Sequence, residues 1–260
     1  MTAEMLTKPV ATNRSPSVPA RAESPPKKPN YESGRLPQPI EYLDSDGQPM
    51  AESDFQFEPL SYAVESLKIH FQNRNDVYVA GNIFFYYEEG DPTEVIAPDV
   101  LVVIGAEKHK RNSYKLWEEP KAPDFVLEIT SKSTRNKDQG AKKGLYQHLG
   151  VTEYFCYDPT GDYLDPPLLG YRLEEGRYVS IPPKEVTPIK VVVPSTILGM
   201  DLQVADREFR FVDPRTGLIL RNFAETNQQL TETEAARVRG EARIRELEAQ
   251  LAAMRTTGSK

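Results

Sequence analysis

The feature that most constrains this chain is a strand, a helix and a second strand that follow one another within residues 123–159. The first strand is the apolar run Phe125–Ile129, the helix is predicted from about 134 to 149, and an aromatic strand follows at Glu153–Tyr157. This order of elements within this length is typical of a βαβ-type unit. We therefore expect an α/β fold organised around it.

A single carboxylate, Glu128, interrupts the first of these strands. Burial of an ionised carboxylate among apolar side chains is costly unless a partner compensates it, and a central strand normally carries Val or Ile at such a position. Glu128 therefore either faces water on a half-exposed sheet or serves as a metal-binding or acid–base carboxylate.

A second carboxylate, Asp99, stands between Pro98 and the strongly apolar run of residues 100–104. Two acids on two apolar strands could converge at neighbouring positions of one sheet. Such a pair does not ionise comfortably without a cation, so a divalent metal is the predicted third member. Pro-Asp before a strand is also a common turn, which is the alternative interpretation.

The predicted helix carries two stripes at a spacing of four residues. The polar stripe consists of Asp138, Lys142 and Tyr146, and the apolar stripe, which would hold the helix on the sheet, consists of Ala141, Leu145 and Leu149. Lys142 would then project toward Glu128 as its positive partner. The alternative is an exposed Asp138–Lys142 pair that contributes about 0.3–0.5 kcal/mol.

Taken together, these motifs resemble the Uma2 family, which is similar to the restriction-endonuclease-like PD-(D/E)xK nucleases. The resemblance covers about residues 55–215. The residues that carry it are Pro98, Asp99, Glu128, Ser131, Ser133, Thr134, Arg135, Asp138, Lys142, Tyr146, Gly150, Val151, Glu153, Tyr154, Asp158 and Pro159. It implies a restriction-endonuclease-like mixed β-sheet flanked by helices, here with added β-hairpins and a long C-terminal helix.

The resemblance also implies a function, which is Mg²⁺- or Mn²⁺-dependent hydrolysis of phosphodiester bonds in nucleic acid, with DNA favoured as the substrate and RNA left open. Asp99 and Glu128 would hold the metal, with the carbonyl of Ile129 as a further ligand. The lysine that the nuclease pattern places two residues after the glutamate is Thr130 here. Uma2-like sequences share this departure, and the family pattern then points to Lys142 as the catalytic lysine.

Three further residues of the helix region are expected to support the site or to contact phosphate. They are Arg135, Asp138 and Tyr146. Basic residues also cluster after each of the two acids, where a phosphate backbone would approach, or where they would simply be solvated. These clusters are Lys108, Lys110, Arg111 and Lys115 in the first loop, and Lys132, Arg135, Lys137, Lys142 and Lys143 in the second region.

The competing class is a catalytically inactive, nuclease-like scaffold that acts as an oligomeric protein- or DNA-binding module. Thr130 and the net charge of −7 favour it. The retained Asp99, Glu128 and Lys142 favour the enzyme.

Composition divides the chain into three parts. Residues 1–52 are rich in Pro and Ser and are expected to be a disordered tail, residues 53–221 form the nuclease-like domain, and residues 222–260 form a long helix. Within the domain we expect an amphipathic helix over 59–73, a strand over 76–87 that bends at Gly81–Asn82, and a hairpin around 174–177.

The C-terminal helix carries apolar residues at coiled-coil spacing over its last two heptads, at Ile244, Leu247, Leu251 and Met254. Arg237 and Gly240 interrupt this spacing upstream. A homodimer through this helix and a solvated single helix both remain open.

No apolar run approaches the ~20 residues of a membrane span, and the first residues lack the apolar stretch of a signal peptide. Cys156 is the only cysteine, which excludes a disulfide framework, and the three histidines lack the spacing of zinc ligands. We therefore expect a cytoplasmic protein without a membrane partner.

Overall fold

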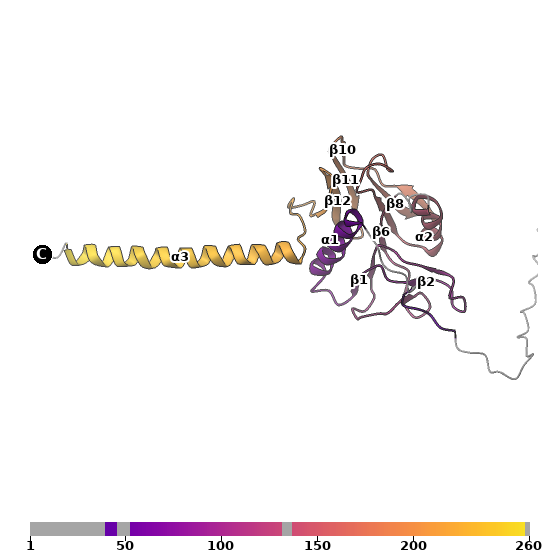
Figure 1. Ribbon diagram of the computed structural model, residues 1–260, viewed down its shortest axis with the longest axis horizontal. Helices are drawn as coiled ribbons and strands as arrows, with labels where there is room; N and C mark the ends of the chain where they lie inside the picture. The colour runs from indigo at the N-terminus through magenta and orange to yellow at the C-terminus, as the bar shows by residue number, and fades with distance from the viewer. Residues whose placement is uncertain (1–39, 46–52, 132–136, 258–260) are drawn as a thin grey trace, which may run out of the picture. The chain divides into compact units, whose positions relative to one another are not determined.

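In the computed structural model, the strand that carries Glu128 lies inside a six-stranded mixed sheet (Figure 1). The strands in spatial order are β1 (Val77–Gly81), β4 (Val100–Ile104), β6 (Phe125–Ile129), β7 (Glu153–Tyr157), β8 (Leu168–Glu174) and β9 (Arg177–Ser180). β6 and β7 are parallel, and every other neighbouring pair is antiparallel. The single parallel pair is the one joined by the predicted crossover helix, because parallel neighbours need a long connection.

Two smaller sheets accompany the central one. The four-stranded antiparallel sheet consists of β10 (Glu185–Thr187), β11 (Lys190–Ser195), β12 (Met200–Ala205) and β13 (Glu208–Val212). The three-stranded sheet, in spatial order, consists of β3 (Val95–Ile96), β2 (Phe85–Tyr86) and β5 (Tyr114–Lys115). The helical segments are α1 (Asp54–His70), the π-helix η1 (Lys137–Lys142), α2 (Lys143–Leu149) and α3 (Phe223–Thr257).

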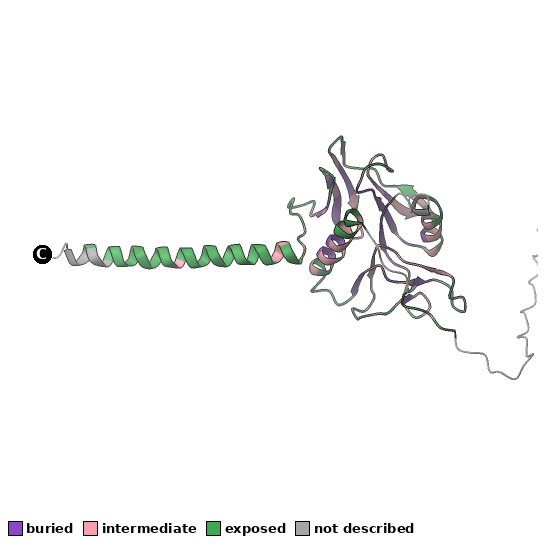
Figure 2. Ribbon diagram, in the orientation of Figure 1, coloured by how far each residue is buried: buried purple, intermediate pink, exposed green. Residues whose placement is uncertain are grey.

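The central sheet is covered on both faces, as Figure 2 shows by the burial of its strands. Phe125, Leu127 and Ile129 share one core with α1 and with the strands β11–β13. Val126 points to the other face and shares a second core with Tyr146 of α2 and with β2 and β5. Because side chains alternate along a strand, Glu128 lies on the same face as Val126, beneath α2.

The structure describes residues 40–45, 53–131 and 137–257, which all belong to one compact unit. Most of the predicted tail, residues 1–52, therefore lies outside the described residues. Its residues 40–45 are described, and Tyr42 packs on Tyr86 of β2 with ring centroids 5.0 Å apart. None of the described helices combines the length and the apolar composition that a membrane span requires.

The mixed α/β architecture predicted from the sequence is confirmed. β6 and β7 have the predicted bounds, and the bend expected at Gly81–Asn82 separates β1 from β2. Asn82 has φ of 49°, in the left-handed region that Asn tolerates better than most residues. The first helix begins at Asp54 instead of at the expected position 59, so Pro59 lies inside the helix and not at its start.

Candidate active site

Glu128 lies at the centre of the candidate site and is only 1% exposed. Two side chains from the crossover helix bind its two oxygens. The ammonium group of Lys142 lies 2.7 Å from Oε2, and the hydroxyl of Tyr146 donates to Oε1 over 2.6 Å. A buried carboxylate needs such partners, and here both oxygens have one.

The local helix geometry explains why both groups reach the same carboxylate. Lys142 ends the π-helix and Tyr146 lies one turn further along, so the two side chains leave the helix on one face. α2 ends at Leu149, and the capping residue Gly150, whose φ of 82° suits glycine, turns the chain toward β7. The stripe that includes Lys142 and Tyr146 therefore faces the sheet.

The apolar stripe expected to hold the helix is only partly used. Leu149 packs against the core, whereas Ala141 is exposed. Tyr146 is fully buried and supplies the main contact instead. The π-helical turn shifts the rotational register of the segment, which a sequence pattern with a regular spacing of four residues does not anticipate.

Asp99 directly precedes β4, and the strand register places it opposite Glu128. The antiparallel pairs of β4 and β6 join residues whose numbers sum to 227, as in Val100 with Leu127, and 99 + 128 gives the same sum. Directly opposite residues of an antiparallel pair point to the same face of the sheet. Asp99 and Glu128 therefore lie on one face, at adjacent strand positions.

The carboxylate of Asp99 also binds the backbone of β6. Its Oδ2 accepts the N–H of Ile129 over 2.6 Å, so a side-chain hydrogen bond links the two strands just beyond their last backbone pair, Val100 with Leu127. Asp99 is half-buried, so it is more accessible than Glu128. The pair therefore consists of one fully buried carboxylate, Glu128, and one half-buried carboxylate, Asp99.

The donor atoms at this position fit a hard divalent cation in type. Asp99 and Glu128 supply carboxylate oxygens. Ile129, whose N–H donates to Asp99, follows Glu128 directly and offers its backbone carbonyl, to which the amide of Gln56 donates over 3.5 Å. Mg²⁺ is commonly held by one or two carboxylates and keeps several of its waters. The described part of the chain contains no group of three or more His, Cys, Asp or Glu side chains that could hold a metal.

An aromatic wall encloses Glu128 on the side of β7. The ring of Tyr154 lies 5.3 Å from that of Tyr146 and stacks further on Tyr171 and Tyr178. Burial, with the nearby Cys156 and Glu128 as smaller causes, raises the pKa of Tyr154 well above its ordinary value. This environment of low polarity strengthens the interactions that Glu128 makes.

The structure does not describe the side chains of two of the predicted supporting residues. Arg135 is outside the described residues, and the side chain of Asp138 is not described although its backbone belongs to η1. The structure thus brings together Asp99, Glu128, Lys142 and Tyr146 among the residues predicted for the site.

Thr130 is a feature that the sequence pattern treats only as a missing lysine. Its residue is 1% exposed, and within the described residues its hydroxyl is the one buried side-chain polar group without a hydrogen-bond partner. It lies two residues beyond Glu128 and so on the same face of β6. No signal in the sequence indicates an unpaired hydroxyl, because this depends on the packing around it.

Another buried carboxylate, Glu153, shows that burial alone does not mark a reactive group. It lies at the start of β7, opposite Phe125 and thus at the other end of the strand pair. Its oxygens accept hydrogen bonds from Ser195 and Thr196, and Arg172 pairs with it at 3.0 Å. Glu153 therefore joins the central sheet to the loop after β11.

The chain matches the model of the Uma2 family, described as "Putative restriction endonuclease", over residues 33–205. No curated protein matches it. Among solved structures it resembles a "putative nuclease belonging to DUF820" from Anabaena variabilis, at 17% sequence identity and a TM-score of 0.38. That match covers 54% of this chain and 74% of the other.

Proposed function

The chain belongs to the Uma2 family, and we propose that it is a metal-dependent endonuclease that hydrolyses phosphodiester bonds in nucleic acid, with DNA preferred over RNA. The observation that carries this proposal is the arrangement around Glu128. A buried carboxylate with a lysine at 2.7 Å lies on the same sheet face as a second carboxylate, Asp99. The single buried cysteine, Cys156, suits the cytoplasm as the compartment of action.

Asp99, Glu128 and the carbonyl of Ile129 would hold Mg²⁺ or Mn²⁺. When bound, such an ion polarises phosphoryl oxygens and lowers the pKa of a coordinated water. The role of the protein in this step would be to hold the metal ligands in place before the substrate binds. Tyr146 restrains one oxygen of Glu128, and the N–H of Ile129 restrains one oxygen of Asp99.

Lys142 would supply the positive charge that the nuclease pattern places at Thr130. Its side chain is 21% exposed, so the ammonium group borders solvent while it contacts Glu128. A phosphate beside Glu128 would come within reach of this group, which would stabilise the negative charge that develops on the phosphoryl oxygens. Arg135 would contact a neighbouring phosphate, and Asp138 would orient Lys142.

The alternative function is an inactive nuclease-like scaffold that binds protein or DNA as an oligomer. Two observations favour it. Thr130 replaces the lysine of the nuclease pattern, and Glu128 forms an ion pair with Lys142. In this case α3, which exposes Leu230, Ile244 and Leu251, would be the element that recruits a partner.

Plasmid nicking under a titration of Mg²⁺ and Mn²⁺ separates the two functions. We expect the wild-type protein to nick, and Asp99→Ala and Glu128→Ala to lose at least about 10²-fold in rate. Glu174→Ala is the matched control, because this exposed glutamate ends β8 and lies away from the site. Nicking by Asp99→Ala and Glu128→Ala at the wild-type rate would refute the assignment. A wild-type protein that is inactive with both metals would favour the scaffold.

A further inference from the structure

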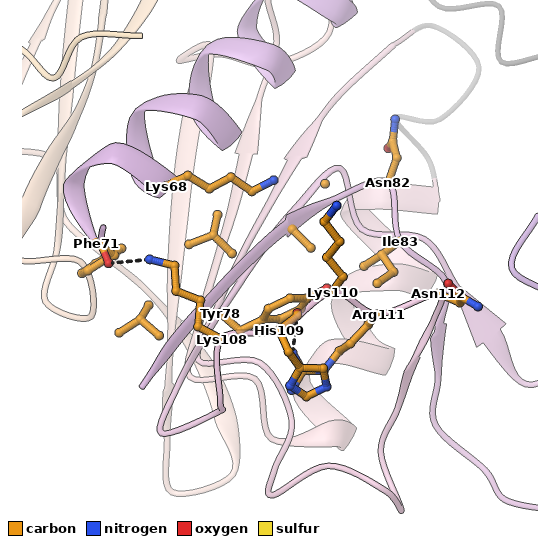
Figure 3. A pocket seen from close by; sticks show the side chains of 14 residues that line it. Lys68, Phe71, Tyr78, Asn82, Ile83, Lys108, His109, Lys110, Arg111 and Asn112 are labelled. Atoms are coloured by element: carbon orange, nitrogen blue, oxygen red, sulfur yellow. Dashed lines mark hydrogen bonds between the residues drawn. The ribbon is translucent and has the colours of Figure 1, made fainter. Parts of the chain in front are cut away.

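A pocket of about 710 Å³ lies along β1, the strand at the outer edge of the central sheet. One wall comes from the C-terminal end of α1, with Lys68 and Phe71, and a second wall comes from residues 108–112, of which Lys108 reaches Phe71 (Figure 3). The floor is β1 itself, followed by Asn82 and Ile83. The pocket therefore follows the length of an edge strand.

Backbone groups of β1 face this pocket. The N–H of Gly105 donates to the carbonyl of Asp76, which marks these two residues as a hydrogen-bonded pair in the ladder of β1 and β4. Hydrogen-bonded and non-hydrogen-bonded pairs alternate along an antiparallel ladder, so Val77, Val79 and Gly81 direct their N–H and C=O groups away from β4. Within the described residues no strand pairs with them on that side. The edge thus presents a row of hydrogen-bond donors and acceptors.

The side chains around the pocket are positively charged. Its lining contains Lys68, Lys108, Lys110 and Arg111 and no Asp or Glu, although the whole chain has a net charge of −7. Figure 3 shows the ammonium groups of Lys68 and Lys110 directed into the pocket. A concentration of one sign of charge in a hollow attracts a ligand of the opposite sign.

These four cations divide into two pairs by what they contact. Lys108 donates to the carbonyls of Phe71 and Gln72 at the end of α1, and Arg111 forms an ion pair with Glu119. Lys68 and Lys110 are exposed and have no carboxylate within ion-pair distance among the described residues. Lys68 and Lys110 are thus the two lysines available to an external anion.

The pocket ends next to the candidate active site. The N–H of Asn82 donates to the carbonyls of Pro98 and Asp99, over 3.1 Å and 3.3 Å. A Cβ atom on Gly81 would lie 3.0 Å from the carbonyl of Asp99, so the backbone of β1 and the residue that would hold a metal are in direct contact. An extended anion bound along β1 would therefore lead toward Asp99.

We propose that this β1 groove binds the sugar–phosphate backbone of the nucleic acid and guides it to Asp99. The inference rests on the proposed nuclease function and adds the place where the substrate binds. An acidic peptide that pairs with β1 would meet the same backbone groups. The position of the groove beside the carboxylate pair favours nucleic acid, because phosphates then repeat along the path from Lys110 to the site of cleavage.

The test measures binding of a short fluorescent DNA duplex to the full chain by anisotropy, in EDTA so that no metal-dependent cleavage occurs. The variant is Lys68→Ala/Lys110→Ala. The control, Arg177→Ala/Arg239→Ala, removes two exposed charges from the β8–β9 turn and from α3. Each phosphate contact contributes about 0.9 to the magnitude of the slope of log K for DNA binding against log salt. Removal of both lysines should therefore reduce the magnitude of this slope by about 1.8. At ~0.1 M salt, each lysine removed should weaken the affinity for DNA about eightfold.

If the groove variant binds DNA with the same affinity and the same salt slope as wild type, the β1 groove is not the binding site. In that case the proposed nuclease function still holds, provided that wild type nicks plasmid with Mg²⁺. Loss of DNA binding only in the groove variant supports the groove, even if no protein nicks. Polyglutamate serves as the acidic peptide. If it binds wild type as tightly as DNA does and displaces DNA from it, the groove belongs to an acidic partner and the proposal is wrong.

Discussion

Lys142 and Tyr146 bind the two oxygens of one carboxylate, Glu128, at 2.7 Å and 2.6 Å. The two donors lie on one short helical segment, and the acceptor lies on a buried strand that precedes it. The crossover helix is therefore joined to the sheet through the same residue that would hold a metal. Any loss of these contacts should affect both stability and chemistry.

Tyr146→Phe removes one hydrogen bond to an ionised group and leaves an oxygen of Glu128 without that donor. We expect it to lower the free energy of unfolding by about 1.5–3 kcal/mol, measured by urea denaturation. Tyr178→Phe is the matched control, because its hydroxyl donates to the neutral carbonyl of Val151 and should contribute only about 1 kcal/mol. Equal losses in the two variants would argue against an ionised Glu128.

Thr130→Val tests the buried hydroxyl that has no described partner. Valine has nearly the same shape, so the substitution should raise the free energy of unfolding by up to about 1 kcal/mol, because an unpaired polar group no longer has to be buried. Nicking should be unchanged if Lys142 supplies the catalytic charge. A clear loss of stability would show that the hydroxyl does have a partner in the folded protein.

The hydrogen bonds to Asp158, in the turn after β7, should make the stability of the folded protein sensitive to acid. Burial would raise the pKa of its carboxyl, but hydrogen bonds from Tyr163, Thr160 and Leu164 outweigh that effect and lower the pKa below its ordinary value of 3.8. Because the pKa is lower in the folded state, the stabilisation is complete above that ordinary value and is lost as the pH falls through the folded-state pKa.

The corresponding variant is Asp158→Asn, which should cost about 1–3 kcal/mol at neutral pH. Denaturation at a series of pH values should show a constant difference from wild type between about pH 5 and 8, and a smaller one below about pH 4. A difference that grows toward acid pH would have the wrong sign for this explanation.

The helix α3 is exposed along almost its whole length (Figure 2), including Leu247, Leu251 and Met254. We propose that a second copy of the chain covers this apolar spacing in a coiled coil. Truncation after Asn222 should then lower the mass measured by light scattering from that of a dimer to that of a monomer. If truncation lowers the mass of the particle only by the mass of the residues removed, α3 is a solvated single helix and the coiled-coil proposal is wrong.

The sequence predicts the central unit well because its signals are local. An apolar run bounded by Asp and Thr defines β6, and the spacing of four residues between Lys142 and Tyr146 places both on the side of the helix that faces Glu128. The adjacency of Asp99 and Glu128 follows only from the pairing of β4 with β6. Sequence alone suggests that these two strands are neighbours but does not give their register.

Other features depend on which elements meet in space. The edge position of β1, and with it the pocket beside Lys68, cannot be inferred from the apolar pattern of residues 77–81. Tyr42 lies in a stretch without periodicity that the sequence assigns to the tail, yet it packs between Tyr86 and Trp117. One aromatic residue carries no periodic signal, so composition outweighs it in a sequence-based prediction.

The rate of plasmid nicking by Lys142→Met relative to Lys143→Met tests the central claim most directly. The two lysines are adjacent, but Lys143 lies 3.4 Å from the centre of the Tyr171 ring instead of at Glu128. With both variants shown to be folded by circular dichroism, Lys142→Met should nick about 10²–10³-fold more slowly than wild type, and Lys143→Met should stay near the wild-type rate. Equal rates in the two variants would contradict a catalytic lysine supplied by the crossover helix.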